Sequence, residues 1–107
     1  GEDTLSLHDA LPIYRNGLYL AHPGAPAGHR IWTYATLDTA ATVDTTGYFN
    51  SASKELAIGD TILVKVVTGS VKTPTGITAQ QWLFVNANAA GVVDTSDGSA
   101  IAATDTD

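Results

Sequence analysis

The sequence predicts an all-β fold, a small antiparallel sandwich or barrel with one short helix. Three observations support this prediction. Runs rich in Thr, Val, Ile and aromatic residues recur at about ten-residue spacing, which is typical of short strands. Segments that contain Gly, Pro or Asp separate these runs, as turns do. Start and stop signals for a helix occur together in one short stretch only, and there is no convincing internal repeat.

The clearest strand patterns lie in the middle of the chain. Alternating side chains in HRIWTYAT predict a strand over 29–36. The run TILVKVVTG, 61–69, is apolar on both faces apart from Lys65, which predicts a central strand covered on two sides. A Pro and a Gly in SVKTPTGIT predict an exposed hairpin loop, after which AQQWLFVNANA, 79–89, resumes as a strand.

The helix and the C-terminal strands are predicted from capping and turn residues. Asp38 stands where an N-cap belongs and Gly47 where a helix stops, so we expect a helix of two turns between them. The Asp-Gly pair at 97–98 is flanked by VVDTS and SAIAAT, a standard hairpin signal. We therefore expect the last two strands over 91–95 and 99–104.

The first residues of the chain do not belong to this pattern. The stretch TLSLHDALPI, Thr4 to Ile13, resembles the translation, in one reading frame, of a widely used sequencing adapter. We therefore treat residues 1–13 as an artefactual or disordered leader and exclude them from fold reasoning. Residues 14–107 are expected to form a single β-rich domain, in which the segment HPGAPAG, 22–28, serves as an extended N-terminal arm or a surface loop.

Composition excludes several kinds of partner. The chain has 107 residues, no Cys and a formal net charge of −6. Disulfides and Cys-based zinc sites are therefore excluded, and self-association is the expected support for so small a core. Five scattered Lys and Arg form no basic stripe, which argues against direct binding of nucleic acid. No apolar run approaches the roughly 20 residues that span a membrane.

Residue patterns for catalysis or cofactor binding are also missing. His22 and His29 are separated by a Pro- and Gly-rich loop, with no third ligand in view for a metal. Neither a nucleophile elbow nor a phosphate-binding Gly-rich loop occurs. The stretch DTSDG, with Asp94 and Asp97, lacks the alternating ligands of a calcium loop, and turn chemistry explains it better. We expect a protein that is not an enzyme and binds no cofactor or metal.

The large aromatic residues are the remaining candidates for function. In a small domain most of them must serve as core, although one exposed pair at an interface remains open. The set contains Trp32, Tyr34, Tyr48, Phe49, Trp82 and Phe84. Our candidate interface residues are Tyr48, Phe49 and Trp82.

A run of structural motifs resembles small virion-associated proteins of tailed bacteriophages. The pattern is Trp-x-Tyr at 32–34, Asp38 with Ala-Ala-Thr-Val at 40–43, Gly-Tyr-Phe-Asn at 47–50, and Leu56 before Gly-Asp at 59–60. In size and composition the capsid decoration, or cement, class is most similar. These motifs carry no catalytic residues.

The resemblance implies a setting for the protein. The expectation is a non-enzymatic protein on the capsid surface of a virion that binds the major capsid protein, forms a homotrimer and stabilises the head shell. A tail-fibre or receptor-binding module is the alternative. In that module exposed aromatic rings such as Trp82 or Tyr34 would stack on host glycans.

Overall fold

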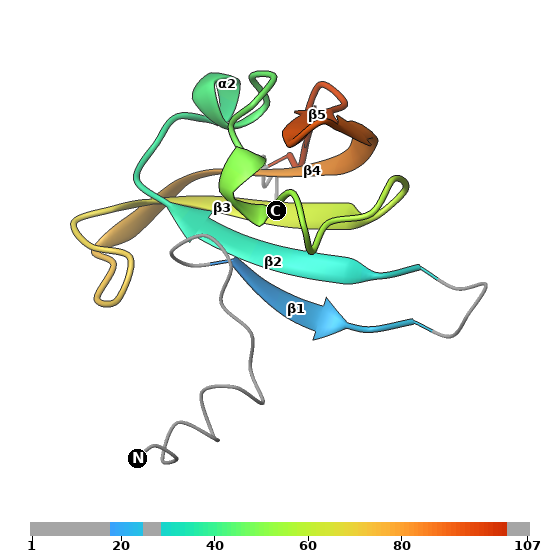
Figure 1. Cartoon of the computed structure of the whole chain (residues 1–107). Helices are drawn as coiled ribbons and strands as arrows, with labels where there is room; N and C mark the ends of the chain where they lie inside the picture. The colour runs from blue at the N-terminus through green and yellow to red at the C-terminus, as the bar shows by residue number, and fades with distance from the viewer. Residues whose placement is uncertain (1–17, 25–28, 103–107) are drawn as a thin grey trace, which may run out of the picture.

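The computed structural model describes residues 18–24 and 29–102. They form one six-stranded sheet with the strand order β1-β2-β3-β4-β5, and β6 pairs with β4 beside β5. The strands are β1 Leu18–His22, β2 Ile31–Thr36, β3 Thr61–Thr68, β4 Gly76–Ala89, β5 Val92–Thr95 and β6 Ser99–Ala100. The predicted all-β, mostly antiparallel class with one short helix is confirmed (Figure 1).

The two central strands and their hairpin follow the sequence pattern closely. β3 and β4 pair antiparallel from Thr61 opposite Phe84 to Thr68 opposite Gly76, so the predicted hairpin loop lies between them. β1 also pairs antiparallel with β2, which makes HPGAPAG the connection between two neighbouring strands. Residues 25–28 of that segment and the predicted leader, 1–13, lie outside the described residues.

One strand pair departs from the antiparallel pattern. β2 and β3 run parallel, with Ile31 opposite Thr61 and Thr36 opposite Val66. A parallel pair needs a long return connection, which here is the segment 37–60. This crossover segment contains the helix α2, Ala40–Val43, and the 3-10 turn η2, Asn50–Ala52. Both lie on the same side of the sheet (Figure 1).

The helix is shorter than predicted and begins one residue later. Its N-cap is Thr39, whose hydroxyl accepts a hydrogen bond from the Thr42 N–H, so the assignment of Asp38 to this role is wrong. The helix has one turn because the chain then turns towards β5, where the Gly47 N–H donates to the Val93 carbonyl at 2.9 Å. This bond takes the backbone out of the helical path before a second turn forms.

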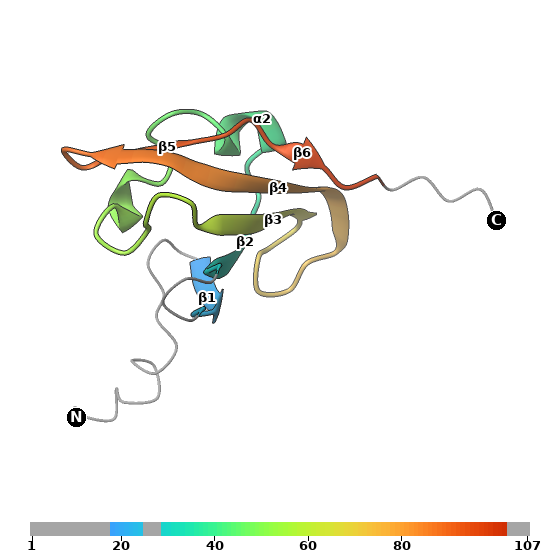
Figure 2. The same ribbon diagram turned by 90° about the vertical axis from the view of Figure 1, so that its right-hand side faces the viewer.

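The C-terminal hairpin was predicted at the wrong turn. β5 and β6 each pair with β4, and not with each other, so the Asp-Gly pair at 97–98 only connects them (Figure 2). The hairpin turn is Ala90-Gly91, between Ala89 and its partner Val92. Both turn residues have positive φ, 53° and 81°, as a two-residue type I′ turn requires.

The core lies between the sheet and the crossover segment, which supplies most of the second layer of the small sandwich. Alternate residues of β2, β3 and β4 point inwards, and they meet Val43, Phe49, Ala52 and Leu56 of the crossover segment. The rings of Tyr34, Tyr48 and Phe49 pack edge to face, with centroids 5.0 to 6.0 Å apart. One face of the sheet is thereby buried.

The opposite face of the sheet is largely uncovered in the described part of the chain, although Val67 at the end of β3 is 3 % exposed. On β3, Leu63 is only half-buried and Lys65 is exposed, whereas Ile62 and Val64 are fully buried. Within the described part of the chain, the prediction that this strand is covered on two sides is therefore wrong as far as Lys65 and holds at Val67. We call the uncovered side of the sheet the open face.

Candidate interaction face

The strand register arranges the side chains of the open face in three rows. Residues directly opposite each other on paired strands point to the same side of a sheet. The first row is His22, Ile31, Thr61 and Phe84, the second is Tyr19, Thr33, Leu63, Trp82 and Ser99, and the third is Ala35, Lys65 and Gln80. The first two rows contain no Lys, Arg, Asp or Glu.

Trp82 and Phe84, which we call the aromatic pair, are exposed side chains of β4 on this face, which also carries Tyr19 at 42 % exposure. They are 39 % and 47 % exposed, whereas Leu83 and Val85 between and after them are 2 % and 0 % exposed. The alternation follows from the two-residue period of β4. Ser96 fixes the backbone here, because its hydroxyl accepts from the Phe84 N–H and its own N–H donates to the Phe84 carbonyl. The pair therefore stands on rigid backbone.

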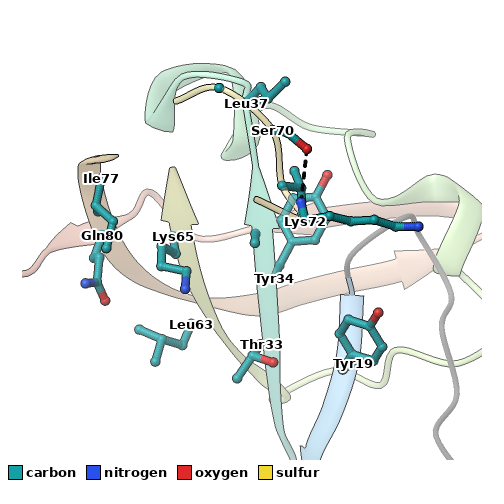
Figure 3. A pocket seen from close by; sticks show the side chains of 13 residues that line it. Tyr19, Thr33, Tyr34, Leu37, Leu63, Lys65, Ser70, Lys72, Ile77 and Gln80 are labelled. Carbon is teal, nitrogen blue, oxygen red and sulfur yellow. Dashed lines mark hydrogen bonds between the residues drawn. The ribbon is translucent and has the colours of Figure 1, made fainter. Parts of the chain in front are cut away.

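A groove of about 870 Å³ occupies the other end of the open face (Figure 3). Its sides come from β1 to β4 and from the β3–β4 loop. The lining residues are Tyr19, Thr33, Tyr34, Ala35, Leu37, Leu63, Lys65, Gly69, Ser70, Val71, Lys72, Ile77 and Gln80. Trp82 and Phe84 are not among them, so the aromatic pair and the groove are neighbouring but separate parts of the face.

The β3–β4 loop that borders the groove is held by local hydrogen bonds. The hydroxyls of Thr68 and Thr75 lie 3.0 Å apart across its base. Within the loop the Lys72 N–H donates to the Ser70 hydroxyl at 3.2 Å. Gly69 has φ of +84° and lies against Thr75, so the loop turns sharply there. These contacts give the groove a defined wall.

Charge is distributed unevenly between the two sides of the molecule. Lys65 and Lys72 line the groove, and none of its lining residues in the described part of the chain is acidic. Three carboxylates near the end of α2 form what we call the acidic patch: Asp44, Asp94, which is bonded to Thr46, and Asp97, which precedes the Gly98 N–H that donates to Asp44. The protein therefore has a basic groove and an acidic region at different places on its surface.

The three predicted interface residues occupy different surroundings. Trp82 is exposed on the open face. Tyr48 is half-buried, and its hydroxyl contacts the hydroxyl of Tyr34 at 2.9 Å and donates to Asp38. Phe49 is 1 % exposed and belongs to the core, so it has no surface for a partner in this fold. The contact role is untested, and among the three we retain Trp82 for it.

The groove, Phe84 and Tyr19 were not singled out as an interface by the sequence. Phe84 lies two residues after Trp82 on the same strand, so it points to the same face. This spacing was the signal in the sequence that could have identified Phe84. Tyr34, named for glycan stacking, is 5 % exposed and points into the core.

The residues considered for metal binding are not brought together. Within 18–24 and 29–102 there is no group of three or more His, Cys, Asp or Glu that could hold a metal ion. No helix in the described ranges is both long and apolar enough to cross a membrane.

Comparison of the chain with protein-family models, with curated proteins and with solved structures finds no match.

Proposed function

We propose that this protein is a non-enzymatic virion structural protein, a capsid decoration protein that binds the major capsid protein at the capsid surface and stabilises the head shell. The observation that carries the proposal is the aromatic pair, exposed on a rigid sheet among neighbours without charge. Contiguous exposed apolar surface on a small domain is typical of a protein interface. In this reading the protein acts by contact, and no side chain performs chemistry.

The aromatic pair can supply a useful binding energy. Full burial of a side chain of this size contributes about 1.5 to 3 kcal/mol, and covering the 39 % and 47 % that are exposed supplies roughly half of that for each ring. Ile31 adds a further apolar side chain in the row of Phe84. A sheet that is already folded avoids the additional cost of ordering loops on docking, although the rigid-body entropy of association must still be offset.

The proposal is tested by adding purified protein to particles that lack it and measuring what sediments with them. We expect Trp82→Asp and Phe84→Asp each to abolish co-sedimentation while the β-rich circular dichroism spectrum is retained. The matched control is Ile58→Asp, because Ile58 is 67 % exposed and lies in the crossover segment. Unchanged binding of both aromatic variants would contradict the proposal.

A tail-fibre or receptor-binding module that recognises glycans is the alternative, and one observation favours it. Trp82 has the polar side chain of Ser99 directly beside it in its row, an arrangement suited to stacking on a sugar. Negative-stain images of particles with and without the protein separate the two functions. Decoration gives regular density over the head, whereas a receptor module gives density at the tail only.

A further inference from the structure

We propose that copies of this protein bind one another head to tail, with the basic groove of one copy receiving the acidic patch of the next. The inference deepens the proposed function, because it gives the contact that would build the expected homotrimer. It assigns the groove to a second copy of this chain and leaves the aromatic pair for the shell.

Charge complementarity is the first argument. The groove has two Lys and no acidic lining residue in the described ranges, although the whole chain carries a formal net charge of −6. Positive charge is therefore concentrated where an apolar hollow already exists. A partner with carboxylates at its surface fits both properties, and this chain presents such a surface itself.

The acidic patch is a defined surface with fixed geometry. Asp44 accepts a hydrogen bond from the Gly98 N–H at 3.2 Å, which places Asp97 beside the end of α2. Asp94 accepts from the Thr46 hydroxyl at 3.0 Å, so β5 adds its carboxylate to the same region. Asp97 is exposed, whereas Asp38 follows the groove residue Leu37 and is therefore not part of the patch.

The surface beside these carboxylates allows close approach. Ala41 and Thr42 of α2 are exposed and small, so the one-turn helix has no bulky side chain to hold a partner away. The groove offers Leu37, Leu63 and Ile77 for contact with them. Lys65 and Lys72 then pair with the carboxylates of the acidic patch. Docking removes part of the water around these charges, so salt screens the ion pairs less than it would on a free surface.

The two surfaces are different, which determines the symmetry. A contact between unlike surfaces is heterologous and closes into a ring when the rotation between copies permits it. A trimer around a threefold axis requires this type of contact. In a twofold dimer each groove would have to receive the patch of the other copy at the same time, whereas a ring needs one such contact between each pair of neighbours.

The test uses charge reversal on each surface separately. The groove variant is Lys65→Glu with Lys72→Glu, and the patch variant is Asp94→Lys with Asp97→Lys. We expect each variant alone to associate at least about tenfold more weakly than the unaltered protein in sedimentation equilibrium, which corresponds to about 1.4 kcal/mol. Mixing the two variants should restore association between unlike copies, because the intact patch of the first then meets the intact groove of the second. A closed ring of three always places two like copies side by side, so the recovered species are pairs and open chains.

The control is Lys54→Glu, because Lys54 is exposed in the crossover segment and belongs to neither surface. It should associate as the unaltered protein does. Circular dichroism spectra identify any variant that has failed to fold. A variant with only one reversed charge on the same surface then takes its place.

The inference is overturned if the unaltered protein is monomeric at about 100 µM, which is far above the roughly micromolar range of useful contacts. It is also overturned if the charge-reversed variants associate as strongly as the unaltered protein. A mixture of the two variants that does not associate would overturn it as well. Co-sedimentation of the unaltered protein with particles is measured separately. Retained particle binding without self-association would therefore refute the head-to-tail contact and leave the proposed function standing.

Discussion

The indole N–H of Trp32 donates a hydrogen bond of 3.0 Å to the carboxylate of Asp60, which lies 28 residues further along the chain. The same carboxylate oxygen accepts from the Ala57 N–H and pairs with the Arg30 guanidinium, each at 3.0 Å. Arg30 also lies over the Trp32 ring, 5.3 Å from its centroid. Asp60 is 4 % exposed, so one buried carboxylate joins the start of β2 to the end of the crossover segment.

We expect Asp60→Ala to lower the free energy of unfolding by about 3 kcal/mol, because it leaves a cation, an indole N–H and a backbone N–H without their acceptor. The Arg30 side chain is 35 % exposed, so water compensates part of the loss, and the value lies at the lower end for a broken buried pair. Urea unfolding measures it. Asp97→Ala is the control, and a loss below about 1 kcal/mol for Asp60→Ala would contradict this account.

The close approach of Gly98 to Gln81 gives a second prediction. A Cβ at position 98 would overlap the Gln81 side chain, which is 4 % exposed and donates to the Ala40 carbonyl at 3.1 Å. We expect Gly98→Ala to cost about 1 to 3 kcal/mol, because Gln81 must leave this position. Thermal unfolding measures the cost.

A double-mutant cycle isolates the cause. In a Gln81→Ala background the overlap is absent, so adding Gly98→Ala should cost much less than it does alone. Equal costs in both backgrounds would mean that the side chain of Gln81 is not the obstacle.

Ala90 gives a prediction of increased stability. Its φ of 53° is unfavourable for alanine, whereas Asn adopts this conformation more readily and Asn-Gly is the preferred type I′ pair. We expect Ala90→Asn to raise the free energy of unfolding by about 0.5 to 1 kcal/mol. Ala89→Asn, in the strand immediately before, is the control and should give no gain. A loss of stability for Ala90→Asn would show that the turn has another geometry.

The adapter-like leader gives the fourth prediction. Residues 1–13 lie outside the described residues, and a translated adapter has no history of packing against the domain. Deleting them should change the free energy of unfolding by less than about 0.5 kcal/mol, the usual range for surface changes. Comparing denaturant curves of the two proteins measures this. A loss of several kcal/mol would end the artefact interpretation.

Sequence patterns predicted the three central strands. β2 was placed from its alternating side chains, whereas β3 and β4 were placed from apolar runs between turn residues. The parallel pairing of β2 with β3 was not predicted, since side-chain alternation contains no information on strand direction. The Asp-Gly pair was misleading because both flanking segments find a partner in the long strand β4.

The candidate face could be predicted only in part. Trp82 was selected, and the same alternation places Phe84 beside it. The groove depends on bringing Lys65 of β3 together with Lys72 of the following loop and Leu37 from beyond β2. These residues come together because of the order of the strands in the sheet and the conformation of the loop, which are properties of the tertiary structure. Phe49 shows the converse, because its burial depends on how the crossover segment lies over the sheet.

The parallel pair at the centre of the sheet also determines the order in which the chain can fold. β3 and β4 are joined by the short loop 69–75, so their hairpin closes at small entropic cost. β2 can join β3 only when the whole segment 37–60 has closed, and this non-local step sets the rate. Substitutions that loosen α2 or η2, which belong to this segment, should therefore slow refolding as well as accelerate unfolding.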